Sequence, residues 1–135
     1  MNMSVDNDAG DTGVTVLRLE GDLDAASYES LIARGRELYD AGTRDLLVDM
    51  RGVGFMGSSG LVALHSVALI LQGLQPPDPE HGWAAFHAMS DGTGDEPQVL
   101  KVLGPQPSVL RALERTGMTR FIEVHDDEQA ALRSF

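Results

Sequence analysis

The stretch from Leu46 to Leu71, LLVDMRGVGFMGSSGLVALHSVALIL, constrains the fold more than any other part of the chain. It opens with a short apolar run bounded by turn-forming residues, which predicts a buried strand. Glycines at positions 52, 54 and 57 then predict a turn. Apolar residues at helical spacing follow, and they predict a helix whose core-facing side is formed by Leu61, Leu64, Ala68 and Leu71. Ser58 and Ser59 are therefore expected at the positive end of a helix, on a strand-to-helix turn.

Two kinds of phosphate-binding site have a similar turn. The glycines match the dinucleotide pattern G-x-G-x-x-G, but Phe55 and Met56 would place bulky groups where backbone amides should meet a pyrophosphate. In addition, no acidic residue closes a second strand about 20 residues further on. A P-loop needs lysine where this chain has Ser58. Both phosphate-binding hypotheses are therefore disfavoured.

A serine hydrolase is the third alternative at this turn. The order Gly57-Ser58-Ser59-Gly60 lies close to the nucleophile elbow G-x-S-x-G, but neither serine has glycines at both required offsets. A catalytic triad would also need a histidine and an acid. His125 and an upstream aspartate could be proposed, but nothing in the sequence brings these residues together. We therefore expect no catalytic residues, and the plain structural alternative for Ser58 is a helix cap.

The rest of the chain alternates strand-like and helix-like segments. Strands are expected at Val14–Glu20, Gln98–Leu103 and Phe121–Val124, and helices after Asp24, from Pro107 and over Asp127–Arg133. Gly42 and Gly117 are expected to end the first two of these helices. This alternation predicts an α/β fold with a mixed, largely parallel sheet of four to five strands and about four helices. An antiparallel pair is expected among the first strands, across Gly21–Asp24.

Two segments do not follow this alternation. Residues 1–13 are polar and are expected to form a flexible arm ahead of a single domain over 14–135. Residues 75–97 are rich in proline and glycine, which predicts a loop insertion. This insertion carries Trp83, the only tryptophan of the chain.

The charge of the chain limits its partners. The formal net charge is −11, from 21 acidic and 10 basic residues. Such a field repels phosphate backbones and anionic membranes, so we expect neither nucleic acid nor a membrane as a partner, and a protein with a basic patch fits better. The chain has no cysteine, which excludes disulfides and thiolate metal sites. No signal peptide or membrane-spanning run is evident, so a cytoplasmic location is expected.

Several short motifs occur together in the order of one known family. The family pattern is a buried strand that ends in Asp, then V-x-F-[MI], then D-S-[ST]-G-L at the start of a helix. This chain has Asp49, Val53, Phe55, Met56, Ser58, Ser59, Gly60 and Leu61 in that order. Gly21-Asp22-Leu23-Asp24 is similar to the family's G-[DE]-L-D turn, and Thr116-Gly117-Met118 resembles its S-G-L turn. On these residues the chain resembles the STAS domain, and more narrowly the bacterial anti-sigma factor antagonists.

The resemblance implies a function based on protein binding, without a cofactor, a metal or catalysis. An antagonist of this family binds an anti-sigma factor that is also a serine kinase, and thereby frees the sigma factor. The kinase then phosphorylates the antagonist, the complex dissociates, and a phosphatase resets it. Carried over residue by residue, this implies phosphorylation at Ser58 and partner contacts at Asp22, Asp24, Met56, Gly57, Ser59, Gly60 and Leu61.

One residue departs from the family pattern. The family has Asp immediately before the serine, and this chain has Gly57. A glycine removes a negative charge and a hydrogen-bond acceptor beside the hydroxyl. The alternative function is therefore a STAS scaffold or adaptor, in a transporter or a stress-signalling complex, that is not regulated by phosphorylation.

Overall fold

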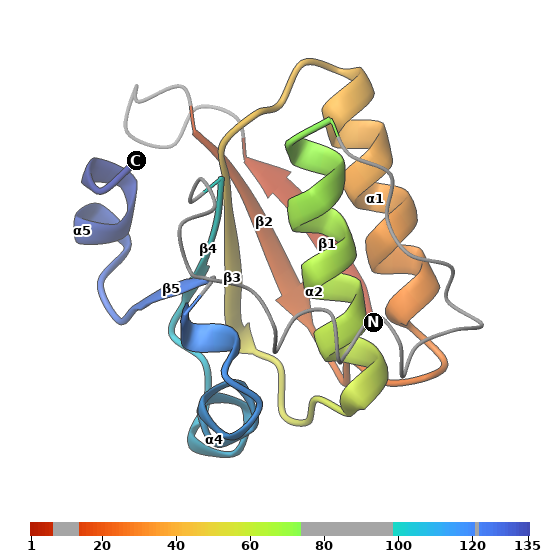
Figure 1. Ribbon diagram of the computed structural model, residues 1–135, viewed down its shortest axis with the longest axis vertical. Coiled ribbons are helices and arrows are strands. Elements are labelled where there is room, and N and C mark those ends of the chain that lie inside the picture. The colour runs from red at the N-terminus through yellow and green to blue at the C-terminus, as the bar shows by residue number, and fades with distance from the viewer. Residues whose placement is uncertain (7–13, 74–98, 121) are drawn as a thin grey trace.

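Five strands and four α-helices make up the part of the chain that the computed structural model describes, which is residues 1–6, 14–73, 99–120 and 122–135 (Figure 1). The strands are β1 (Asn2–Asp6), β2 (Thr15–Glu20), β3 (Leu46–Gly52), β4 (Leu100–Leu103) and β5 (Glu123–His125). The helices are α1 (Tyr28–Asp40), α2 (Ser58–Leu71), α4 (Pro107–Arg115) and α5 (Glu128–Arg133), with a 3-10 turn η3 (Met118–Arg120). The expected α/β fold is confirmed.

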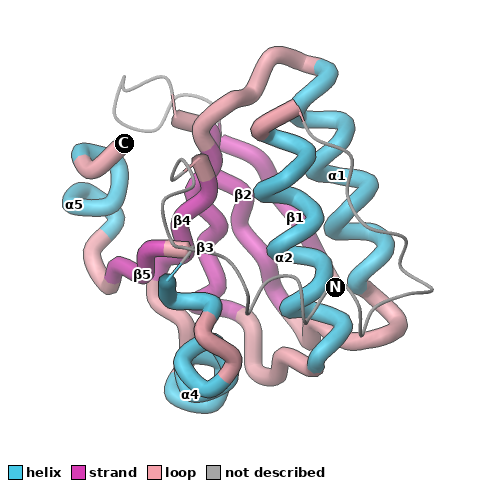
Figure 2. The backbone as a smooth tube through the Cα atoms, in the orientation of Figure 1, coloured by secondary structure: helices cyan, strands magenta, loops and turns pink. Residues whose placement is uncertain are grey.

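The strands form one sheet in the order β1-β2-β3-β4-β5. Strand β1 is antiparallel to β2, and the remaining neighbours are parallel. Because parallel strands end at the same edge of a sheet, the loops that follow β2, β3 and β4 share one edge. Figure 2 shows the loops into α1 and α2 at that edge. Functional sites of α/β proteins are often found at the carboxyl ends of the strands.

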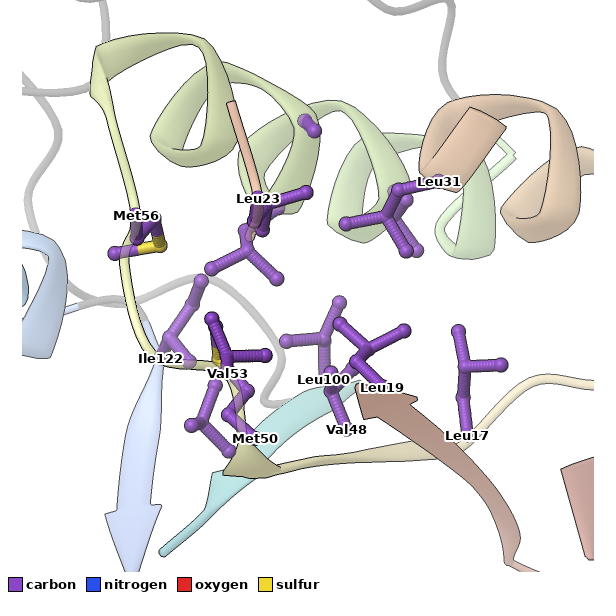
Figure 3. Packing of buried hydrophobic residues seen from close by; sticks show 14 of the residues in the cluster. Leu17, Leu19, Leu23, Leu31, Val48, Met50, Val53, Met56, Leu100 and Ile122 are labelled. Carbon is purple, nitrogen blue, oxygen red and sulfur yellow. The ribbon is translucent and has the colours of Figure 1, made fainter. Parts of the chain in front are cut away.

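The main core lies between the sheet and helices α1, α2 and α4 (Figure 3). It is built from the residues of the strands that alternate toward these helices, such as Leu17 and Leu19 on β2 and Val48 and Met50 on β3. Helices α1 and α2 approach closely at Gly35, where an added Cβ would lie 2.8 Å from Cγ2 of Val67. Three of the four predicted core positions of α2 are buried, and Ala68 is half-buried against the same core.

The opposite face of the sheet is covered by α5. Six buried residues form this second, smaller core, namely Val14, Val16, Leu47, Leu103, Ala131 and Leu132. Lys101 lies beside them with only 3% of its surface exposed, and its Nζ donates hydrogen bonds to the carbonyl and hydroxyl oxygens of Ser134, both at 2.8 Å. These contacts fix the end of the chain against the sheet.

Two expectations about the first strands are wrong. Within the arm expected over residues 1–13, Asn2–Asp6 form strand β1, where Met3 packs against the main core and Asp6 lies 3.6 Å from Arg18. No antiparallel pair forms across Gly21–Asp24, because β2 and β3 are parallel and β1 supplies the antiparallel partner. Residues 7–13 and the expected insertion at 75–97, with Trp83, lie outside the described residues.

The predicted ends of the helices agree well with the structure. Gly42, with φ +106°, follows the end of α1, Pro107 is the first residue of α4, and Gly117, with φ +78°, follows α4. None of the described helices has both the length and the apolar character needed to cross a membrane.

Candidate functional site

Two loops lie side by side at the carboxyl edge of the sheet, and together they form the candidate site. One loop, residues 21–27, follows β2, and the other, residues 53–57, follows β3. The N–H of Leu23 donates to the carbonyl of Phe55 at 2.9 Å, and the N–H of Gly57 donates to the carbonyl of Leu23 at 3.0 Å. Leu23 and Met56 form a parallel bridge. We call these two segments the loop pair.

The loop pair is held from inside by apolar packing. Leu23 is fully buried and Met56 is 7% exposed, and both lie in the same cluster as Val53 and Ile122 (Figure 3). Gly60, in the first turn of α2, fits directly under them. A Cβ on Gly60 would lie 2.6 Å from Cγ of Met56 and 2.9 Å from the carbonyl oxygen of Leu23. The first turn of α2 can approach the loop pair this closely only because residue 60 has no side chain.

A buried hydroxyl fixes the first of the two loops. Ser27 is 7% exposed, and its Oγ donates to the carbonyl of Asp22 at 2.7 Å and accepts from the N–H of Asp24 at 3.0 Å. The Asp24 carboxylate accepts the N–H of Ala26 at 3.0 Å. Ser27 is the N-cap residue of α1, but its hydroxyl bonds to the loop and not to the amides of the helix. The two aspartates are therefore held on a rigid turn.

The structure places Ser58 on the surface. It is the first residue of α2, and Gly57 is the N-cap residue, so Ser58 is not the helix cap. The Ser58 side chain is exposed and makes no hydrogen bond within the part of the chain that is described. Ser59 is half-buried. The Ser58 hydroxyl thus lies at the N-terminus of α2, where the first backbone amides of the helix are found.

The other expected partner contacts divide into two groups. Asp22 is exposed, while Asp24 and Gly57 are half-buried, so these three residues can reach a partner together with Ser58 and Ser59. Met56, Gly60 and Leu61 are buried. The side chains of Met56 and Leu61 lie in the core and Gly60 lies under the loop pair, so none of the three forms its outer surface.

Gly57 has an ordinary backbone conformation. Its φ is −87° and its ψ is −178°, which any residue adopts. A Cβ added there would meet its nearest atom, Cε1 of Phe55, at 3.6 Å, which is ordinary van der Waals distance. The fold therefore does not require glycine at this position, and it has room for a Cβ.

Phe55 is a surface residue that sequence reasoning did not assign to the site. It is 54% exposed, although its neighbours Val53 and Met56 are buried. The sequence signal that could have identified it is a phenylalanine placed between Gly54 and Gly57 in a turn. Just before this loop, at the end of β3, the carbonyl of Arg51 accepts a hydrogen bond of 3.0 Å from Nε2 of Gln106, the N-cap residue of α4.

A group of charged residues lies below the loop pair, on the face of the sheet that α5 covers. Asp49 accepts two hydrogen bonds from the Arg51 side chain, at 3.0 and 2.8 Å, and one from Arg18 at 2.9 Å. Arg18 also donates to Glu128 of α5 at 2.8 Å. Burial raises the pKa of Asp49, but the hydrogen bonds from Arg51 and Arg18 outweigh burial, so the pKa lies below its usual value of 3.8. These ion pairs connect β2, β3 and α5.

The geometry argues against the three alternatives considered for the glycine turn. The N–H of Val53 bonds to the carbonyl of Met50, and that of Gly57 bonds to Leu23, so neither amide is available for a phosphate. His125 lies on β5, where its Nε2 is 2.6 Å from Glu123 and 3.3 Å from Ser134. Ser58 and Ser59 are not among its partners. Within the described ranges, no group of three or more metal-ligating side chains occurs.

Comparisons with solved structures identify the fold. The structure of the anti-sigma factor antagonist SpoIIAA in its unphosphorylated form matches with a TM-score of 0.61 and 18% identity, over 98% of this chain and 96% of that one. An anti-sigma factor antagonist from Mycobacterium paratuberculosis matches with 0.61 and 17%, over 98% and 92%. The Bacillus cell fate determinant SpoIIAA in its phosphorylated form matches with 0.55 and 16%, over 99% and 100%.

Comparison by sequence identifies the family. No curated protein sequence matches this chain. The family model described as "Mlab, STAS domain" matches residues 8–75, which is half of the chain and includes both loops of the loop pair and all of α2. The chain therefore belongs to the STAS domain family.

Proposed function

We propose that this protein is an anti-sigma factor antagonist whose binding is switched off by phosphorylation at Ser58. It binds an anti-sigma factor that has serine kinase activity, and so releases a sigma factor for transcription. The observation that carries this proposal is the free, exposed hydroxyl of Ser58 at the start of α2, beside a rigid loop pair. The fold shared with anti-sigma factor antagonists supports the same role.

The rigidity of the loop pair suits it for docking. The two backbone hydrogen bonds that make up the Leu23–Met56 bridge set the shape of the surface before a partner arrives. A preformed surface loses little conformational entropy on binding, which favours affinity. The exposed carboxylate of Asp22 and the half-buried Asp24 give this surface a negative charge. A basic surface on the anti-sigma factor would complement it.

Phosphorylation would act at the interface and would leave the fold unchanged. A phosphate adds a charge of about −1.5 to −2 and three acceptor oxygens. At the start of α2 the helix dipole favours that charge by roughly 0.3–1 kcal/mol. The partner, in contrast, would meet a bulky dianion where a small hydroxyl had fitted. A thousandfold loss of affinity corresponds to only about 4 kcal/mol, which one desolvated phosphate can supply.

The rest of the regulatory cycle follows from this role. A phosphatase that acts on phospho-Ser58 would restore binding. The protein would work in the cytoplasm, where the sigma factor and its anti-sigma factor act, and would need no cofactor or catalytic residue of its own. The net charge of −11 favours a protein partner over nucleic acid or a lipid surface.

A second candidate function rests on Gly57. Without an acidic side chain at this position, Ser58 has no carboxylate immediately before it in the chain. A STAS scaffold or adaptor subunit, in a transporter or a stress-signalling complex, would bind through the same loop pair and would not be phosphorylated.

The experiment that tests the proposal is intact-mass measurement after incubation with ATP and each serine-kinase anti-sigma factor encoded in the same genome. We expect one added phosphate on the wild type and on Ser59→Ala, which is the matched control, and none on Ser58→Ala. Ser58→Asp should bind the same anti-sigma factor more weakly than the wild type. Binding without phosphate transfer would favour the scaffold. The absence of both binding and transfer would contradict the proposed function.

A further inference from the structure

Phe55 is the most exposed large apolar side chain in the described part of the chain. It is 54% exposed, compared with 37% for Met1 and 36% for Val5. Single exposed apolar residues are common on protein surfaces, so exposure alone says little. Phe55 differs because its backbone is held by a hydrogen bond to Leu23 and because its ring lies beside Gly57, the residue before the proposed phosphorylation site.

The backbone around Phe55 forces its side chain outward. The Phe55 carbonyl accepts the N–H of Leu23 at 2.9 Å, and two residues later the N–H of Gly57 donates to Leu23 at 3.0 Å. Between these bonds, Met56 occupies the inner side and is 7% exposed. If the Phe55 ring turned inward, it would have to displace Met56 and break the bridge to Leu23. The ring is therefore presented to solvent by the hydrogen-bonded part of the loop pair.

The ring lies against Gly57, the residue that precedes Ser58. A Cβ on Gly57 would be 3.6 Å from Cε1 and 3.8 Å from Cζ of Phe55. Since Gly57 has no side chain, this side of the ring stays uncovered. Glycine at position 57 thus leaves an apolar surface, and not a charged one, at the residue that precedes Ser58.

We propose that Phe55 is the apolar anchor of the docking surface, and that the partner is a protein with an apolar pocket for this ring, bordered by basic side chains that face Asp22 and Asp24. The proposal rests on the proposed function, because it describes the same surface. Charge complementarity argues for the basic border, since the chain carries a net charge of −11 and both loop aspartates lie on this edge. Aromatic anchors in desolvated pockets dominate many protein interfaces.

The anchor also explains how phosphorylation would release the partner. A pocket that receives the Phe55 ring must exclude water around it, and the neighbouring residue 58 must be desolvated at the same time. A hydroxyl tolerates this at little cost, whereas a phosphate dianion does not. Phosphorylation would then prevent the ring from entering its pocket without any change in the fold of this protein.

The test measures association and dissociation rates with the anti-sigma factor that binds the wild type. Phe55→Ala should weaken binding by about thirtyfold or more, mainly through faster dissociation, and the factor should be similar at low and high salt. Phe55→Leu should keep most of the affinity. Val5→Ala, which truncates another exposed apolar residue on β1, is the matched control and should bind within twofold of the wild type. Asp22→Asn should instead slow association and reduce its dependence on salt.

The outcomes separate this inference from the proposed function. If the wild type binds and Phe55→Ala, with an unchanged melting temperature, binds equally well, the anchor is overturned while the antagonist function stands. If Phe55→Ala and Val5→Ala weaken binding to the same extent, the anchor is overturned as well. If no serine-kinase anti-sigma factor binds the wild type, both the proposed function and the inference are overturned.

Discussion

Leu23 and Met56 face each other across a single parallel bridge, which joins the loop after β2 to the loop after β3 beyond the ends of their strands. The bridge continues the pairing of β2 and β3 into the loops and buries both side chains. It also gives Phe55, Ser58 and the aspartates of the first loop one common support.

Gly60→Ala should destabilise the protein, whereas Gly57→Ala should not. At Gly60 the new Cβ would lie 2.9 Å from the carbonyl oxygen of Leu23 and 2.6 Å from Cγ of Met56, so the loop pair must shift. Such overpacking costs about 1–3 kcal/mol. At Gly57 the nearest atom is 3.6 Å away and φ is −87°, so we expect a change within about 0.5 kcal/mol. Urea unfolding of the two variants measures both effects, and equal stabilities would show that Gly60 does not hold the loop pair.

Gly104→Ala should destabilise the protein for two separable reasons. Gly104 has φ +59°, which strains an alanine, and the new Cβ would clash with Cγ of Arg51. We expect a loss of about 1–3 kcal/mol in the free energy of unfolding. In the background of Arg51→Ala the clash is absent and only the strain remains, so Gly104→Ala should cost less there. An equal cost in both backgrounds, measured by a double-mutant cycle, would mean that the Arg51 contact contributes nothing.

The stability of the protein should fall in acid because of Asp49. Its pKa in the folded protein lies below the usual value of 3.8, so the unfolded state binds the proton more tightly. The stabilising contribution is therefore complete above about pH 3.8 and disappears as the pH falls through the lower pKa of the folded state. Asp49→Asn, which has the same shape, should cost about 1–3 kcal/mol at pH 7 through weaker bonds to Arg18 and Arg51.

Urea unfolding of wild type and Asp49→Asn at several pH values checks the prediction for Asp49. The difference in unfolding free energy should shrink as the pH drops below about 4, because the protonated carboxyl resembles the amide. Glu37→Gln is a suitable control, since Glu37 pairs with Arg34 on the exposed surface of α1 and should change stability little. A difference between wild type and Asp49→Asn that stays constant from pH 7 to pH 2 would contradict the lowered pKa.

The sequence allowed the strand, turn and helix of Leu46–Leu71 to be predicted because periodicity and glycine placement are local signals. Gly42 and Pro107 marked helix boundaries for the same reason. Strand β1 was missed because its residues, NMSVD, have little apolar content. This strand pairs with β2, and Asp6 lies 3.6 Å from Arg18; neither contact is reported by a local pattern.

The candidate site was only partly predictable, because it too depends on contacts between segments that are distant in the sequence. The family motif identified Ser58 and its neighbours, but it could not separate the surface residues from the supports. Gly60 and Met56 belong to the interior because the loop after β2 lies over them, and that contact joins residues far apart in the sequence. Phe55 points outward because Met56 takes the inner side of the loop. An apolar residue in a turn gives no indication of its direction until both loops are placed.

Gly57→Asp should leave the fold intact and increase the rate at which the kinase phosphorylates Ser58. The backbone at Gly57 is extended and an added Cβ makes only ordinary contact with the Phe55 ring, so the melting temperature should change by no more than about 2 °C. The new carboxylate adds negative charge beside Ser58 and should speed association with a basic kinase surface at low salt. Gly57→Asn, which has the same size without the charge, is the matched control. Initial rates of phosphate transfer at low and high salt distinguish the two variants. A gain in rate that Asn shares, or that persists at high salt, would show that the acidic residue of the family pattern acts through shape or hydrogen bonding and not through charge.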